Sequence, residues 1–398
     1  MVSSLASLFA RESVDQVRLR EQTALEELLE QRERRVVLFG AGTLGRSALP
    51  LLGEVGAKTL AFTDNNPAIW GTRIENIPVL SPEQASTLYG SSAVFLVTIW
   101  NDHHWFSETY EKLRGLGCKL ISTYAPIFWR FPDKFMQLLL LNEPPHRVYR
   151  EADAVLEAEH IWADETSLEA YRANIRWRAV GDALELPSRP AENTYFPDDL
   201  FALDESERIL DCGAFDGDTI REALARTKYR IEAIHAVEAD TISFTRLKEF
   251  VAHLDIDLQG RIHLYPFAVG SERGFVRFEC NGALTSKASD KGVRVEVAPI
   301  DELFADTPLT FIKMDIEGAE HDALRGARKV IQRDHPILAI CVYHTQSDIW
   351  RIPLLVHEML PEHGLYLRAY EGDGFQTVMY AMPPVRLRGH SASPIGLN

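Results

Sequence analysis

The feature that most constrains this chain is a pattern that occurs twice: a buried apolar strand, a glycine-rich turn and a helix. The first copy begins near residue 35 and the second near residue 208. Each copy continues into a second strand that ends on a carboxylate, Asp64 in the first and Glu238 in the second. A strand, a crossover helix and a second strand form the building unit of a parallel sheet. The sequence therefore predicts an α/β protein with two such sheets in tandem.

The length of 398 residues exceeds what one hydrophobic core usually holds. We therefore expect two α/β domains separated by a helical segment. The predicted ranges are 1–131 for a lead-in helix and a first Rossmann-like domain, 132–194 for a helical connector, and 195–398 for a second domain. An Asp-Gly pair at 373–374, between two apolar runs, predicts that the chain ends in a hairpin.

Composition and charge exclude several classes of protein. The chain is 46% hydrophobic and 25% charged, as globular proteins are, and no apolar run approaches the ~20 residues of a membrane-spanning helix. A formal net charge of −16 disfavours nucleic-acid binding, which depends on clustered Lys and Arg. The first residues lack the pattern of a secretory signal. We expect a soluble cytoplasmic protein with no nucleic-acid or membrane partner, which could form homo-oligomers.

The cysteines predict neither a zinc site nor a disulfide framework. They lie far apart and form no CxxC pair, so buried free thiols are expected. The four are Cys118, Cys212, Cys280 and Cys341.

The second glycine turn suits a cationic ligand. Asp211 ends its strand, and Gly213 and Gly217 permit backbone angles and a close approach that a side chain would prevent. S-adenosylmethionine (SAM) carries a sulfonium and no pyrophosphate, so acidic residues can lie in its site. Glu238 follows at the offset where an acidic side chain accepts hydrogen bonds from ribose hydroxyls, although it could also be a solvated strand-end carboxylate. The predicted SAM contacts are Asp211, Gly213, Ala214, Phe215, Asp216, Gly217, Glu238, Ala239, Ala268, Val269 and Asp315.

The second domain resembles the FkbM family of methyltransferases. The strings that carry the resemblance are YFP at 195–197, DCGAFDGDT from Asp211, AVEAD around Glu238, FAVG at 267–270 and FIKMDIEGAEHDALRGA from Phe311. The closing stretch also resembles the subgroup of that family with an extra N-terminal domain. The resemblance implies a class I methyltransferase Rossmann-like sheet with a terminal antiparallel hairpin, SAM as cofactor, and O-methylation of a sugar, polysaccharide or glycosylated natural product.

Methyl transfer to an alcohol requires in-line positioning of the two reactants and removal of a proton. Candidate residues follow neighbouring strands at their carboxyl ends, where open α/β sheets bind ligands. They are Asp315, Glu317 and His344. His344 could be the general base, with Asp315 or Glu317 orienting its imidazole or binding the acceptor hydroxyl. Alternatively, His344 could be bonded into a loop while Glu317 and Glu320 stabilise a helix start. Two carboxylates two residues apart do not make a metal site, so no obligatory metal is expected.

The first glycine turn matches the Rossmann fingerprint. Gly40, Gly42 and Gly45 follow the strand, and Asp64 ends the next one. The string from Asp64 resembles the N-terminal nucleotide-sugar-binding domain of certain sugar acetyltransferases, which implies a nucleotide or nucleotide-linked sugar. A domain used for packing, oligomerisation or acceptor positioning is the alternative.

Two other functions remain open at this point. One is an NAD(P)-dependent oxidoreductase that uses the first domain, which the absence of a Tyr-x-x-x-Lys pair beside that domain disfavours. The other is a non-catalytic nucleotide or SAM sensor. His103 and His104, after the third strand, could line a cleft or form an ordinary surface turn.

Overall fold

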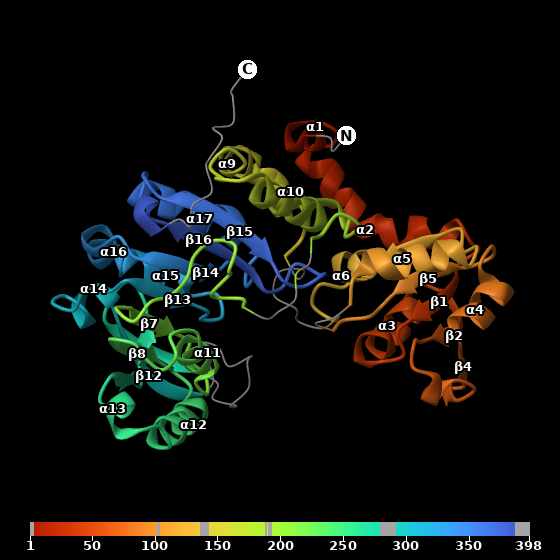
Figure 1. Ribbon diagram of the computed structural model, residues 1–398. Coiled ribbons are helices and arrows are strands. Elements are labelled where there is room, and N and C mark those ends of the chain that lie inside the picture. Colours follow the sequence, from red (N-terminus) through yellow and green to blue (C-terminus); the bar gives the residue numbers. More distant parts are fainter. Residues whose placement is uncertain are drawn as a thin grey trace.

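The chain contains two parallel sheets of the α/β type, as the sequence predicts. The computed structural model describes residues 4–101, 104–135, 143–187, 189, 193–278 and 292–386. In Figure 1 the two sheets form two lobes, with a layer of helices lying across them.

The N-terminal sheet has six strands in the order β3-β4-β2-β1-β5-β6, parallel except for the β3–β4 pair. Side chains alternate between the faces of a strand, so Val36 and Leu38 share a core with α3 and α6, whereas Val37 and Phe39 share one with α4 and α5. The strands are β1 (Arg35–Phe39), β2 (Lys58–Thr63), β3 (Arg73–Ile74), β4 (Ile77–Leu80), β5 (Val94–Val97) and β6 (Ile121–Thr123). The helices are α3 (Thr43–Glu54), η1 (Pro67–Ile69), α4 (Pro82–Tyr89), α5 (Phe106–Gly115) and α6 (Ala125–Arg130).

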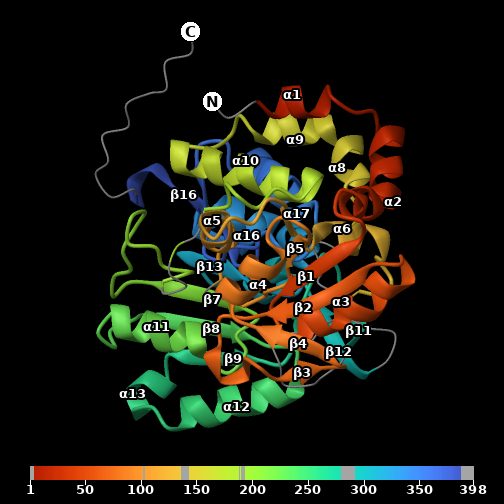
Figure 2. The ribbon, with the colours of Figure 1, turned by 90° about the vertical axis from the view of Figure 1, so that its right-hand side faces the viewer.

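The helical layer joins the two lobes. It comprises α1 (Leu5–Phe9), α2 (Val14–Glu30), α8 (His146–Arg150), α9 (Ala152–Ala158) and α10 (Glu165–Val180). Ser13 and Gln16 form a capping box that starts α2, and Gly181 ends α10 in a left-handed conformation. The Arg20 guanidinium on α2 donates to the carbonyl of Ala179, 3.0 Å away at the end of α10. Figure 2 shows α1, α9 and α10 above both sheets.

The C-terminal sheet has seven strands in the order β15-β16-β14-β13-β7-β8-β9, and β16 runs antiparallel to both β14 and β15. This confirms the predicted parallel sheet with a terminal antiparallel hairpin. The strands are β7 (Arg208–Cys212), β8 (Ala233–Val237), β9 (Ile262–Tyr265), β13 (Phe311–Met314), β14 (Ile337–Cys341), β15 (Gly364–Ala369) and β16 (Thr377–Met382). The helices are α11 (Asp218–Arg226), α12 (Thr241–Ala252), α13 (Ile256–Gln259), α14 (Ile300–Leu303), α15 (Glu320–Arg325), α16 (Arg328–Asp334), α17 (Asp348–Met359) and η2 (Pro384–Arg386).

A small third sheet lies beside the C-terminal one. It has the order β10-β12-β11, and its β11 and β12 strands pair antiparallel. Its strands are β10 (Ala268–Val269), β11 (Gly274–Phe278) and β12 (Val293–Ala298).

The β15–β16 turn brings the carboxyl edges of the two large sheets together. Val378 at the start of β16 is paired with Cys341 at the end of β14, so the turn at 370–376 lies at the edge where β14 ends. Trp100, which follows β5 of the other sheet, has its ring centroid 5.8 Å from that of Phe375 in this turn. The strand ends of both lobes therefore approach the same region of the molecule (Figure 1).

Two further predictions can be compared with the structure. Cys118, Cys212 and Cys341 are buried free thiols, and Cys280 lies outside the described residues. Of the helices that the structure describes, none combines the length and the apolarity needed to cross a bilayer.

Candidate active site

The glycine turn after β7 is packed too tightly for side chains. Gly213 has φ 81°, and a Cβ there would lie 1.9 Å from the carbonyl oxygen of Asp315. Gly217 has φ 92°, and a Cβ there would lie 2.6 Å from the ring of Phe250. Only glycine combines these backbone angles with such close approach. The turn therefore joins the ends of β7 and β13 and lets their backbones border one cavity.

That cavity has a volume of about 460 Å³ and lies at the carboxyl edge of the C-terminal sheet. Most of the predicted site residues line it: Gly213, Phe215, Glu238, Ala239, Ala268, Val269, Asp315 and Glu317. Residues without a predicted role also line it, among them Tyr195, Asp240, Ser243, Phe267 and Lys313. The structure thus brings together strand ends that lie more than 100 residues apart in the sequence.

Glu238 ties the end of β8 to the glycine turn. Its carboxylate accepts hydrogen bonds from the backbone N–H of Phe215 at 2.8 Å and of Asp240 at 2.6 Å. Burial raises the pKa of Glu238 to about 7, although these two backbone bonds act in the opposite direction. A ligand hydroxyl that donates to this carboxylate would favour its ionised form.

Asp211 and Asp216 do not line the cavity, although the sequence predicts both as ligand contacts. Asp211 is fully buried, and its carboxylate lies 3.0 Å from the ammonium of Lys313 on the neighbouring strand. The same ammonium donates to the carbonyl of Gly213 at 2.7 Å. Asp216 pairs with Arg221 at 2.5 Å. Asp211 therefore stabilises the glycine turn indirectly, through Lys313, instead of contacting a ligand. The sequence patterns did not identify Lys313 as its partner. Ala214 and Gly217 also lie outside the cavity lining.

The lining of the cavity is strongly acidic. Its only cationic side chain among the described residues is Lys313, which is already paired with Asp211. The described residues of the lining include seven carboxylates, which are Asp218, Glu238, Asp240, Glu272, Asp315, Glu317 and Asp322. Charges of one sign around a partly enclosed space attract ligands of the opposite sign. The cavity therefore favours a cation over a phosphate.

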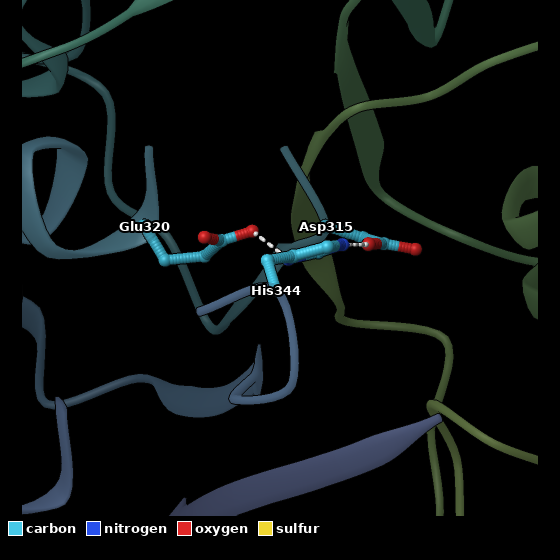
Figure 3. Close-up of side chains that lie close together, drawn as sticks. All are labelled: Asp315, Glu320 and His344. Carbon is cyan, nitrogen blue, oxygen red and sulfur yellow. Dashed lines mark ion pairs between the residues drawn. The ribbon is translucent and has the colours of Figure 1, made fainter. Parts of the chain in front are cut away.

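Behind Asp315, at one end of the cavity, His344 lies between the carboxylates of Asp315 and Glu320 (Figure 3). The Nε2 atom of His344 lies 3.2 Å from Asp315 Oδ1, and its Nδ1 atom lies 2.9 Å from Glu320 Oε1. Glu320 also accepts the backbone N–H of Ile316 at 2.8 Å, so it holds the turn between β13 and α15. The His344 side chain is 2% exposed and does not line the cavity, whereas Asp315 does.

This arrangement shifts two pKa values in opposite directions. Burial lowers the pKa of His344, but the charge of Glu320 and the contact with Asp315 outweigh it, so the pKa is well above its usual range. Burial raises the pKa of Asp315, but its contacts with His344, Lys313 and Tyr195 outweigh that effect and lower it. An imidazolium carries a proton on each ring nitrogen and has no lone pair to accept another. The base role of His344 stays a prediction, and the geometry favours a role in positioning Asp315.

Two tyrosines complete the surroundings of Asp315. The hydroxyl of Tyr195 donates to Oδ2 at 2.7 Å, and that of Tyr343 donates to Oδ1 at 3.3 Å. Tyr195 comes from the segment before β7, where the sequence predicts a domain to begin. The two hydroxyls and the ion pair with His344 act on one carboxylate, which is therefore both ionised and fixed in orientation.

Asp315, Glu320 and His344 are also residue types that bind metals, and their nearest ligand atoms lie within 4.8 Å of one another. The two carboxylates, however, contact opposite nitrogens of the imidazole ring. A single ion could not replace both contacts, whereas the two protons of an imidazolium satisfy both. The cluster therefore has the geometry of a charge network.

In the first glycine turn, close packing of the backbone explains why glycine occurs at two of the three positions. A Cβ on Gly40 would lie 2.6 Å from the carbonyl oxygen of Thr98, and one on Gly45 would lie 2.0 Å from that of Gly40. The Asp64 carboxylate accepts the backbone N–H of Ala41 at 2.9 Å, which closes the turn. Gly42 alone of the three glycines faces open space. Nucleotide binding here stays a prediction.

Of the two histidines noted after the third strand, only one lies within the described residues. The Nε2 atom of His104 lies 2.9 Å from the hydroxyl of Thr109, and burial lowers the pKa of His104 to about 4. His103 lies outside the described residues.

Comparisons with known proteins agree with the geometry of the C-terminal half. The methyltransferase FkbM from Methylobacillus flagellatus KT has the same fold, with 21% identity and a TM-score of 0.73 over 95% of this chain and 99% of that chain. Two further structures match smaller parts. A putative rRNA-methylase from Clostridium thermocellum has 8% identity and a TM-score of 0.30 over 46% of this chain and 87% of its own. RSP, a Rex-family repressor, has 22% identity and a TM-score of 0.21 over 25% of this chain and 48% of its own. No curated protein matches the sequence. Residues 211–370 match the methyltransferase FkbM domain family, and the chain therefore carries an FkbM methyltransferase domain.

Proposed function

We propose that this chain is a SAM-dependent methyltransferase that binds SAM in the cavity at the carboxyl edge of the C-terminal sheet. We further propose that it O-methylates a sugar, a polysaccharide or a glycosylated natural product. The observation that carries the first part is the acidic cavity, which is bordered by a glycine turn and by a carboxylate at the end of the adjacent strand. The family match supports methyl transfer as the reaction.

The residues of the cavity fit SAM in chemistry as well as in size. Glu238 lies at the end of the strand beside the glycine turn, where doubly wound folds bind ribose hydroxyls. The small sheet and the residue before its first strand contribute apolar side chains to the cavity, which are those of Phe267, Val276 and Val297. These apolar side chains suit an adenine ring. Its carboxylates suit the sulfonium and ammonium groups of SAM. When bound, SAM supplies an activated methyl group.

The chain itself must then orient the acceptor hydroxyl in line with the methyl group and receive its proton. Asp315 lies at the end of the cavity beside Tyr195, ionised and held by two tyrosine hydroxyls and the ion pair with His344, and is placed to accept a hydrogen bond from the acceptor hydroxyl. Glu317 lines the same end, with its carboxylate 4.0 Å from His344 Nε2. We propose that Asp315 orients the hydroxyl and that Glu317 takes its proton as the new bond forms.

Glu238→Gln should weaken binding of S-adenosylhomocysteine (SAH) about 10- to 100-fold, because hydrogen bonds to a charged group contribute more than neutral ones. Since the pKa of Glu238 is about 7, its carboxylate ionises as the pH rises through this value. The affinity of the unaltered protein for SAH should therefore increase between about pH 6 and 8, and that of the variant should not. Calorimetric titration across this range measures both effects.

Glu249→Gln is a matched control, because Glu249 is an exposed carboxylate on α12, the helix that follows Asp240 of the cavity lining. It should leave the affinity for SAH and its pH dependence unchanged. If the unaltered protein and Glu238→Gln bind SAH with equal affinity at every pH, Glu238 does not contact the cofactor.

A further inference from the structure

The N-terminal lobe places an exposed tryptophan beside the C-terminal lobe. Trp100 follows β5, at the carboxyl edge of its sheet, and its side chain is 41% exposed. Its ring is tilted against that of Phe375, with the centroids 5.8 Å apart. Tryptophan is enriched at interfaces, and ligand sites occur preferentially at domain boundaries.

Aromatic contacts continue from Trp100 to the end of the SAM cavity. The ring of Phe375 lies 5.8 Å from that of Tyr343, centroid to centroid. The hydroxyl of Tyr343 donates to Asp315, the carboxylate proposed above to bind the acceptor. Two ring contacts and one hydrogen bond therefore connect Trp100 with Asp315, which lines the cavity.

The turn that carries Phe375 packs against the N-terminal lobe and the helical layer. A Cβ on Gly372 would lie 2.3 Å from the ring of Trp105 in the N-terminal lobe. Gly374 has φ 90°, and a Cβ there would lie 3.2 Å from the ring of Trp177 on α10. This close packing holds Phe375, and with it the contact to Trp100, in one place relative to Asp315.

We propose that Trp100 is an acceptor-binding residue that the N-terminal lobe supplies to the methyltransferase site. A pyranose ring of the acceptor stacks on the exposed indole, and a hydroxyl of the acceptor reaches Asp315. This rests on the proposed function. The indole offers an apolar face to the C–H groups of a sugar ring. The carboxylates at this end of the cavity repel anions, so the acceptor ring is neutral or cationic rather than phosphorylated.

Saturation-transfer NMR with named probes tests this proposal. The probes are methyl α-D-glucopyranoside, methyl α-D-mannopyranoside, maltotriose, D-glucosamine and glucose 6-phosphate, each added to the full-length protein saturated with SAH. We expect signals from at least one neutral or cationic probe and none from the phosphate. Trp100→Ala should weaken that binding about 3- to 10-fold, and Trp100→Phe should restore part of it.

Trp70→Ala is the control, because Trp70 lies in the same lobe and is similarly exposed at 38%. It should leave probe binding unchanged. Equal affinity for the probe in Trp100→Ala and in the unaltered protein, or the absence of signals from every sugar in the unaltered protein, would overturn the proposal. Titration with SAH in the same samples separates this outcome from failure of the proposed function, because Trp100 variants should bind SAH normally.

Discussion

Lys313→Met should destabilise the protein by about 3–5 kcal/mol, because it leaves a carboxylate buried without its cation. Lys313 and Asp211 are directly paired in the β7–β13 register, with side chains 2% and 0% exposed. Burial lowers the pKa of Lys313, but the charges of Asp211 and Asp315 outweigh it and raise the pKa, so the ammonium is charged at neutral pH. Denaturation in urea at pH 7, followed by circular dichroism, measures the loss.

The double variant Asp211→Leu/Lys313→Met distinguishes the ion pair from packing. Replacing both partners by apolar residues removes the unpaired charge, so most of the lost stability should return. If the free energy of unfolding of Lys313→Met lies within about 1 kcal/mol of that of the unaltered protein, the ion pair with Lys313 does not stabilise buried Asp211.

His344→Gln should destabilise the protein by about 3–5 kcal/mol at pH 6, and by progressively less as the pH rises. The pKa of His344 is raised in the folded protein. The stability from its protonated form is therefore fully present below the unfolded pKa of about 6.5 and is lost as the pH rises through the folded value. Unfolding free energies at pH 6, 7.5 and 9 test this directly.

The comparison variant is His253→Gln, at an exposed position at the end of α12. Its free energy of unfolding should be close to that of the unaltered protein at all three pH values. A difference between His344→Gln and the unaltered protein that stays flat or grows with pH would show that His344 is neutral in the fold. Its predicted role as general base would then regain support.

The two sheets could be predicted because their strands are continuous apolar runs and their turns contain glycine. The strand-end residues Glu238, Asp315 and Glu317 could be predicted to meet because parallel strands end at one edge. The partner of Asp211 could not be predicted, because it depends on which strand lies beside β7. Lys313 is nevertheless visible in the sequence as a single charged residue inside the apolar strand FIKM, which is a signal for a buried partner.

The contacts of His344 are a second feature that could not be predicted from the sequence. The sequence suggests Glu320 as a charge near a helix start, and α15 does begin at Glu320. Its carboxylate instead binds His344 and the backbone of Ile316, because the end of β14 packs against the turn after β13. Likewise, the contact of Trp100 with Phe375 arises from the approach of two sheets whose strands lie far apart in the sequence. Local patterns carry no information on such contacts.

Calorimetric titration of this chain with SAM, SAH and NAD tests most directly whether the C-terminal cavity binds SAM. We expect one site of about micromolar affinity for SAM and for SAH, and no heat of binding for NAD in that range. Binding of NAD together with the absence of any response to SAM and SAH would contradict this expectation and would favour an oxidoreductase that uses the N-terminal sheet.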